Sequence, residues 1–197
     1  MKRQHILWIV AGMILIGALA RLVPHMNNFA PIGALALFGG AIFTRKGWGI
    51  ALPILAYVLS DFVLSLTNVG YPFLNDKGFL FQRVFDYGAM VLISLLGMRL
   101  RGLTSSTATY AKVGGSAFLS SGIFFLISNF AVWFSGIIFG GESMYSSDAF
   151  GLIHCYQMGL PFYKGTFYGD LLYSGLFFGA YYALFYGKMQ PLSAHES

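Results

Sequence analysis

The chain has 197 residues, of which 57% are hydrophobic and only 10% are charged, with a net charge of +5. Soluble domains carry about 25% charged residues, so this composition excludes an ordinary soluble protein with a water-facing surface. The basic residues separate apolar segments instead of gathering in one polar region, which argues against a nucleic-acid partner. The sequence therefore predicts an integral membrane protein.

Six apolar segments follow one another, and most reach the roughly 20 residues that a membrane-spanning helix needs. They are residues 6–23, 29–43, 48–66, 84–100, 113–139 and 166–186. The first is long for a signal peptide and lacks a small-residue cleavage site, so we expect a retained helix. The second is short enough to be partly re-entrant, and the fifth is long enough to tilt or to project beyond the bilayer. The predicted fold is all-α, a single bundle of about six transmembrane helices.

The basic residues give this bundle a direction by the positive-inside rule. With the amino terminus in the cytoplasm, the cytoplasmic ends hold Lys2, Arg3, Arg45, Lys46, Arg99, Arg101, Lys112 and Lys188, against Arg21, Lys77, Arg83 and Lys164 on the other side. Both termini are then cytoplasmic. The acidic residues, apart from Glu196, fall on the outer side or in the outer half of a segment. Residues 140–164 form the longest external loop, which we expect to lie on the interface or to cap an outward cavity.

Three carboxylates lie inside or at the edge of apolar segments: Asp61 in "YVLSDFVLSL", Asp86 in "RVFDYGAMVL" and Asp170 in "FYGDLLYSGL". An aspartate at the centre of a membrane helix costs about 2.5–3.5 kcal/mol, so it usually faces a partner in the bundle interior or a water-filled cavity. Arg21 has the same predicted depth, and Arg83 precedes Asp86 by one helical turn. A structural ion pair explains Asp86 and Arg83 equally well, whereas for Asp61 and Asp170 we favour a functional cavity.

Two further groups of polar side chains lie on the predicted outer side. Asn129 and Trp133 in "SNFAVW" are four residues apart, so they share a helix face on which an amide and an indole could orient and cover a solute. Anchoring at the membrane interface is the alternative for Trp133. His25, His154 and Cys155 are weak candidates for metal ligands, because their spacing matches no known site. The single cysteine excludes an intrachain disulfide.

No motif in the sequence supplies energy or a specific reaction. A phosphate-binding GxxxxGK[ST] loop is missing, so we do not expect nucleotide hydrolysis by that route. The paired interrupted segments of many inverted-repeat transporters are also missing. A unit of this size would take energy from a partner or equilibrate a solute passively, and we do not expect it to be an enzyme.

Four segments of the chain resemble a bacterial family of small membrane proteins described as transport proteins. They are "RLVPHMNNFAPIGALALFGGAIF", "LSDFVL", "SNFAVW" and "GLPFYKGTFYGDLLYSGLFFG". Members of that family are similar to the S components of energy-coupling-factor (ECF) vitamin transporters. The resemblance implies a six-helix subunit that binds a vitamin or metal ion in an outward-facing cavity, and a partner module with a transmembrane scaffold and ATPases. It also implies that small residues of the first helix dock on that module: Ala11, Gly12 and Ala18, although no AxxxA pattern occurs there.

The residues and the resemblance together predict a substrate-binding subunit for uptake of a small polar solute through the bacterial cytoplasmic membrane, with no cofactor of its own. The expected partners are the solute, membrane lipid and an energising module. The predicted substrate contacts are Arg21, His25, Asn28, Asp61, Asp86, Asn129, Trp133 and Asp170. Two alternatives stay open. One is an integral-membrane enzyme acting on a lipid-linked substrate at the outer leaflet, with Asp61 or Asp170 as acid or base, and the other is a non-catalytic scaffold subunit.

Overall fold

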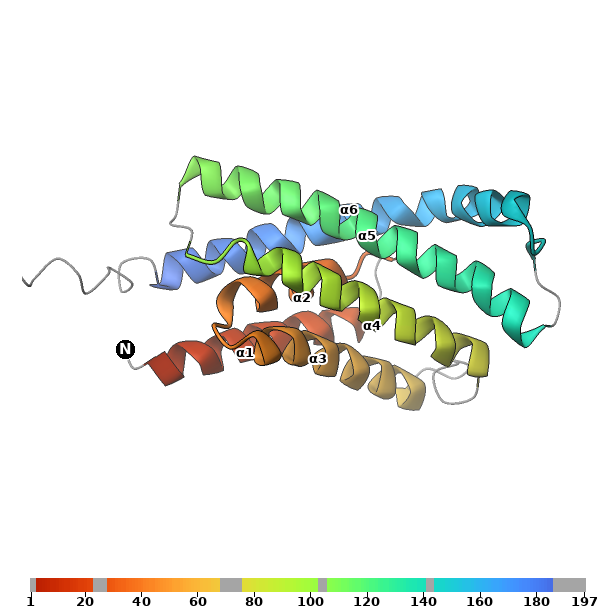
Figure 1. Ribbon diagram of the computed structural model, residues 1–197. Helices are drawn as coiled ribbons and strands as arrows, with labels where there is room; N and C mark the ends of the chain where they lie inside the picture. Colours follow the sequence, from red (N-terminus) through yellow and green to blue (C-terminus); the bar gives the residue numbers. More distant parts are fainter. Residues whose placement is uncertain (1–2, 23–27, 68–75, 103–105, 141–143, 186–197) are drawn as a thin grey trace, which may run out of the picture.

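The computed structural model describes residues 3–22, 28–67, 76–102, 106–140 and 144–185. The elements are α1 (Arg3–Leu19) with a 3-10 turn η1 (Ala20–Leu22), α2 (Ile32–Ile42), α3 (Lys46–Thr67), α4 (Lys77–Met98), α5 (Thr107–Phe139) and α6 (Ala149–Phe185). They run side by side in one elongated bundle (Figure 1). The predicted all-α class is confirmed, since the described ranges contain six α-helices and no strand.

Three of these helices are long and apolar enough to cross a membrane: Lys46–Leu66 within α3, all of α4 and all of α5. Two of them begin earlier than the apolar pattern predicts, because a side chain caps the helix start. The Asp76 carboxylate accepts a hydrogen bond from the Phe79 N–H at 2.9 Å, and Ser106 caps α5 in the same way. Such caps satisfy backbone donors that the helix itself leaves open. The three helices support membrane insertion.

The prediction of an external loop over residues 140–164 is wrong for most of its length. Helix α6 starts at Ala149 and continues for 37 residues through Pro161. Its first turn is fixed by the Asp148 carboxylate, which accepts a hydrogen bond from the Gly151 N–H at 2.9 Å. A proline removes one backbone donor and favours a kink, but packing on neighbouring helices can hold the helix together. Gly140 and residues 144–148 are the described part of this connection outside a helix.

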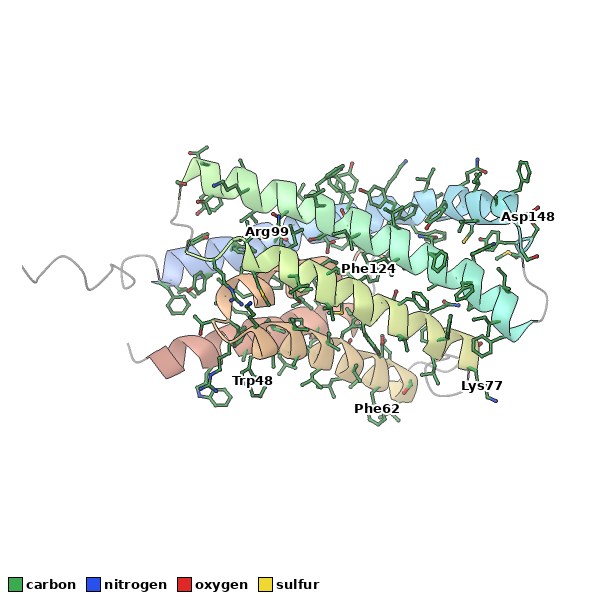
Figure 2. The ribbon with its side chains drawn as sticks, viewed as in Figure 1. Trp48, Phe62, Lys77, Arg99, Phe124 and Asp148 are labelled. Carbon is green, nitrogen blue, oxygen red and sulfur yellow. The ribbon has the colours of Figure 1, made fainter. Side chains whose placement is uncertain are left out.

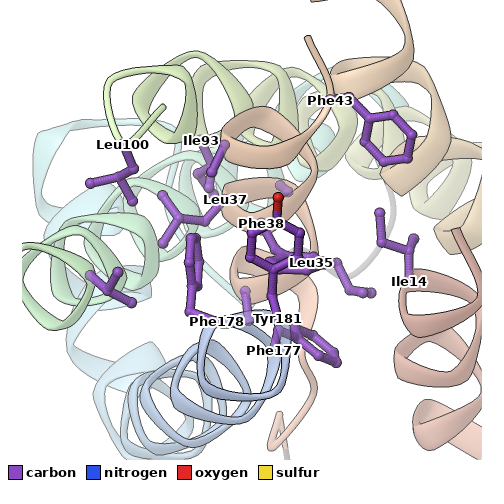
Figure 3. Packing of buried hydrophobic residues seen from close by; sticks show 14 of the residues in the cluster. Ile14, Leu35, Leu37, Phe38, Phe43, Ile93, Leu100, Phe177, Phe178 and Tyr181 are labelled. Carbon is purple, nitrogen blue, oxygen red and sulfur yellow. The ribbon is translucent and has the colours of Figure 1, made fainter. Parts of the chain in front are cut away.

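Helix α2 is the shortest α-helix and lies deepest in the protein. Its 11 residues span about 16 Å, roughly half of the 30 Å hydrocarbon layer, so α2 cannot cross a membrane by itself. Residues 33–41 are all buried, and α2 contacts every other α-helix. Figure 3 shows its side chains Leu35, Leu37 and Phe38 among those of other helices. The second apolar segment is therefore a buried half-length helix.

Glycines allow α2 and α4 to touch along their backbones. A Cβ atom built on Gly40 would lie 2.0 Å from the Ser94 carbonyl oxygen, and one on Gly97 would lie 2.1 Å from the Leu37 carbonyl oxygen. Only a residue without a side chain fits at either position. Close approach of this kind is a main source of helix association in lipid, where hydrophobic burial between helices gives little.

A charged residue from another part of the chain lies at each end of α2. Arg101 donates from Nε to the Gly40 carbonyl at 2.9 Å and from Nη2 to the Phe43 carbonyl at 2.6 Å. At the other end, Asp170 Oδ1 accepts from the Ala34 N–H at 3.0 Å. A cation at a helix carboxyl end and an anion at its amino end both complement the helix dipole. These contacts fix the position of α2 along the bundle.

The half-length α2 divides the bundle into two parts. Figure 1 shows α1 and α2 near one end, whereas α3 to α6 continue toward the other end. We call the part built around α2 the packed half. The open half is enclosed by the end of α3, the start of α4, residues 124–132 of α5 and residues 158–166 of α6. Helix α1 begins and α6 ends at the same end of the bundle, the end of the packed half (Figure 1).

Candidate functional site

The open half contains a cavity of about 560 Å³. Its lining includes Asn28, Ala30 and Ile32, which lie where the chain enters α2, and side chains of α3 to α6 around them. The cavity exists because α2 ends halfway along the bundle and no other segment of the described chain fills the remaining space. Sites for small molecules usually measure about 300–1,000 Å³, so this cavity has the size of a ligand site.

Two arginines and two aspartates form one ion-pair network beside the cavity. Arg21 Nη2 lies 2.8 Å from Asp61 Oδ1, and Arg83 Nε lies 3.3 Å from Asp61 Oδ2. Arg83 Nη1 also donates to Asp86 Oδ2 at 2.6 Å. The side chain of Asp61 is fully buried, while those of Arg21 and Arg83 are 8% and 15% exposed. The four charges cancel, which reduces the cost of holding them inside an apolar bundle.

One face of α3 supplies the other contacts of this network. Tyr57, Ser60, Asp61 and Leu64 are spaced three and four residues apart, so they point the same way. The Arg21 guanidinium lies 4.0 Å from the centre of the Tyr57 ring, a cation–π geometry, and its Nη1 donates to the Ser60 hydroxyl. The Tyr57 hydroxyl accepts from Arg83 Nη1 at 2.6 Å. Tyr57 therefore contacts both arginines.

The three membrane carboxylates have three different environments. Asp61 lies behind the cavity wall and pairs with both arginines. Asp86, which is 4% exposed, lies on the wall itself. Asp170 is fully buried, does not line the cavity and accepts the backbone hydrogen bond of Ala34. A Cβ at Gly33 would lie 2.2 Å from Asp170 Oδ2, so Asp170 packs directly on α2, where it acts as a helix cap.

Asn28 and Asn129 line the cavity as well, but Trp133 does not. Asn129 and Trp133 therefore do not line this cavity together. The connection between α5 and α6 folds back on α5, so the Trp133 indole donates to the Ser146 carbonyl at 2.9 Å. Asn129 Nδ2 donates to the Phe125 carbonyl at 2.8 Å within its own helix. His25, also a predicted contact, lies outside the described residues.

One side chain from the α5–α6 connection reaches the cavity wall, that of Tyr145. Its ring lies edge-on to the ring of His154, with 5.6 Å between the centres. The connection is held by Asp148, whose pKa is lowered by hydrogen bonds from the Ser146 hydroxyl and the Gly151 N–H. In place of the predicted long loop, only the short segment 144–148 of the described connection approaches the cavity, through Tyr145.

The metal candidates do not come together in the described part of the chain. Cys155 is buried and its Sγ donates to the Asn129 carbonyl at 3.3 Å, whereas His154 is exposed. No group of three or more histidine, cysteine, aspartate or glutamate side chains within these ranges could hold a metal ion. His25, the third candidate, is outside them. The structure therefore gives the metal interpretation no geometric support.

The three small residues expected to dock on a partner have different surroundings. Ala18 is 1% exposed and belongs to the internal core, so it cannot contact a partner, and that prediction is wrong for it. Ala11 is partly buried and packs against the core. Gly12 has no neighbouring atom within 4 Å of a built Cβ. Of the three, Gly12 alone has open space beside it.

Sequence reasoning missed several residues of the site. Gln82 and Thr166 line the cavity, and Tyr57 bridges the arginines. The spacing of Tyr57, Ser60 and Asp61 on one helix face was the available signal for α3. No sequence signal pointed to Arg101 as the cap of α2, because that contact joins segments about 60 residues apart.

Nearly the whole chain matches one family. Residues 1–192 match DUF6580, a family of unknown function, and the chain therefore belongs to that family. No curated protein matches the chain, and no solved structure matches it either. The similarity to ECF S components remains a prediction from the sequence.

Proposed function

We propose that this DUF6580 protein is a multi-pass membrane protein that binds a small polar solute for uptake across the bacterial cytoplasmic membrane. The observation that carries this proposal is the 560 Å³ cavity of the open half, with a neutral arginine–aspartate network in its wall. Ion pairs can stabilise a helix bundle by themselves, so the feature that a purely structural subunit would not need is the ligand-sized cavity beside them. Intramembrane ionisable residues usually mark a pathway for a solute or an ion.

The distribution of charge supports an outward-facing cavity. Lys77 and Asp148 lie at the end of the open half, and Arg99 lies at the opposite end (Figure 2). Basic side chains gather with Arg99 at the end of the packed half, where the described residues carry no acidic side chain; they are Arg45, Lys46, Arg101 and Lys112. By the positive-inside rule this end would face the cytoplasm. The open half would then face outward.

The half-length α2 also favours a transport function. Transporters often place a solute site where a helix stops inside the membrane, because the helix end supplies backbone groups and leaves room for a ligand. In this chain the floor of the cavity lies at the start of α2. Because the sequence has no nucleotide-binding loop, we propose that any ATP-driven uptake uses a separate energising module, as in the ECF transporters that the sequence resembles.

Native mass spectrometry of the protein, purified in lipid nanodiscs, tests this proposal. We expect a small molecule to be released stoichiometrically from the wild-type protein and to be lost from the Asp86→Ala variant. The control is Asp170→Asn, which alters a buried carboxylate away from the cavity and retains an oxygen that accepts the Ala34 N–H. Wild-type protein free of any bound small molecule, from cells grown in rich medium, would contradict solute binding.

The released compound then separates transport from the alternatives. Cells expressing the protein with its native neighbours should accumulate that compound, and cells expressing Asp86→Ala should not. Chemical conversion of the compound by the purified protein alone would favour the membrane enzyme. Neither binding nor conversion would favour the scaffold subunit.

A further inference from the structure

We infer that the solute is an uncharged, planar compound that donates a hydrogen bond to Asp86. This inference deepens the proposed function and rests on it. It follows from a carboxylate oxygen of Asp86 that is open among the described residues, from the charge balance around the cavity and from the side chains of the wall.

The open acceptor is the second oxygen of Asp86. Asp86 Oδ2 is bound by Arg83, but Asp86 Oδ1 is buried and has no hydrogen-bond partner in the described structure. A buried carboxylate oxygen without a donor is costly and is normally satisfied by the protein, by water or by a ligand. Because Asp86 lies on the cavity wall, a donor can reach it from the cavity. The solute is therefore expected to present an N–H or O–H group to this oxygen.

The charge balance argues that the solute is uncharged. Among the residues that the structure describes, the charged ones lining the cavity are Arg21, Arg83 and Asp86, and Asp61 lies directly behind the two arginines. Two positive and two negative charges leave this described network with no net charge for an ion to neutralise. A cation at Asp86 would also compete with Arg83 for the same carboxylate, and an anion at either arginine would compete with Asp61. A charged solute would lose its hydration without a compensating opposite charge.

The remaining wall suits a flat compound with polar groups at its edge. Aromatic rings surround the cavity: Phe79, Phe124, Phe125, Phe162 and Tyr163. Flat faces of this kind bury planar ligands well, and the amides of Gln82 and Asn129 add hydrogen-bonding groups at two points. A solute with an amide-like edge would suit this wall. Its N–H would donate to the Asp86 carboxylate, and its neighbouring carbonyl would accept from an arginine.

Three small probes of nearly equal size and shape test the inference: benzamide, which is neutral, benzamidine, which is a cation, and benzoate, which is an anion. Each is titrated against the protein in nanodiscs at millimolar concentration, and binding is followed by saturation-transfer NMR. We expect benzamide to bind most tightly. Asp86→Ala should weaken benzamide at least about tenfold, the usual loss for a hydrogen bond to a charged group, and Asp170→Asn should leave it unchanged.

A second variant keeps the test decisive if Asp86→Ala does not fold. Asp86→Asn conserves shape but removes one negative charge, so the balance beside the cavity becomes one positive charge. The order of affinity should then reverse, with benzoate binding more tightly than benzamide. An unchanged order in this variant would overturn the electrostatic part of the inference.

Failure of the inference is distinguishable from failure of the proposed function. Preference of the wild-type protein for benzamidine or benzoate would overturn the inference, while solute binding in the cavity would stand. Binding of none of the three probes by a protein that releases a native small molecule would do the same. Binding of none, with no released molecule, would overturn both.

Discussion

The packed half and the open half share helices α3 to α6 but differ in α1 and α2, which lie only near the end of the packed half (Figure 1). Helices α4, α5 and α6 run through both parts, but α2 is present only in the packed half. Where α2 is present, glycines bring backbones into contact and the interior is filled. Where it is absent, a cavity remains. The short length of the buried helix α2 thus explains why one part of the bundle is filled and the other contains a cavity.

The two halves also use buried charge differently. In the packed half, Arg101 and Asp170 each bind backbone groups of α2. In the open half, Arg21, Arg83 and Asp61 bind one another beside the cavity. The charges that bind the α2 backbone hold that helix in place. The charges of the ion-pair network also lie close enough to the cavity to contact a solute. Substitutions at four positions test this comparison of the two halves, from the largest expected effect on stability to the smallest.

The largest loss of stability is expected for Asp61→Ala at the border of the two halves. The substitution leaves Arg21 and Arg83 without their shared carboxylate, and removal of one member of a buried ion pair typically costs about 3–5 kcal/mol. Thermal unfolding in detergent should show it. The exposed cap variant Asp76→Ala is the control, with an expected loss near 1 kcal/mol. Equal melting temperatures for the two variants would contradict a structural role for the network.

A smaller loss is expected when the contact of α2 with α4 is disturbed. Gly97→Ala places a Cβ about where the Leu37 carbonyl now lies, and overpacking of this kind costs about 1–3 kcal/mol. Gly88→Ala, on the same helix, meets no atom within 4 Å and should stabilise α4 by up to about 1 kcal/mol. If both variants unfold at the wild-type temperature, α2 is not packed as tightly as its geometry indicates.

Loss of the Asp170 cap on α2 should lower the free energy of unfolding less than the two changes above. The size of the loss should depend on the acceptor oxygen at position 170 more than on its negative charge. Asp170→Ala leaves the Ala34 N–H without its acceptor, and loss of a helix cap costs about 0.5–2 kcal/mol. Asp170→Asn retains an acceptor and should lose less. Unfolding measurements on the pair check this order. A larger loss for the asparagine variant would show that the charge of Asp170, not its oxygen, stabilises α2.

The smallest effect on stability is expected for Asn129→Ala on the cavity wall. The Asn129 Nδ2 donates within its own helix and the amide packs on Gly159 of α6, so the free energy of unfolding should fall by no more than about 1 kcal/mol, the typical effect of a single substitution. Affinity for the released solute should nevertheless fall, measured by titration against the purified variant. A stable variant with wild-type affinity would remove Asn129 from the binding site.

The sequence predicts those features that depend on composition and helix periodicity. Apolar segments predicted an all-helical bundle, and the need of Asp61 for a partner at equal depth pointed to Arg21, which the structure confirms as its ion-pair partner. The pairing of Asp86 with Arg83 followed from their spacing of three residues. These relations are local, or they follow from the cost of a charge in lipid.

Features that depend on long-range packing could not be predicted. Asp170 was expected in the cavity because, like Asp61, it lies inside an apolar segment, but the two carboxylates contact different groups on other helices. Residues 140–164 were predicted as an external loop between two apolar segments, yet those from Ala149 onward belong to α6 and pack on α5. The Trp133 indole donates to the Ser146 carbonyl, a contact between segments that the sequence pattern does not reveal.

The length of α5 has a practical consequence. Its 33 residues extend for about 50 Å, and a tilt beyond the usual 40° would be needed to fit them into 30 Å of hydrocarbon. In a membrane, part of α5 would therefore extend beyond the hydrocarbon layer; at the end where α5 meets α6, the Trp133 indole bonds to the Ser146 carbonyl. A binding protein directed at residues 144–148 would give this 21.6 kDa protein a rigid external feature for aligning particle images in electron cryomicroscopy.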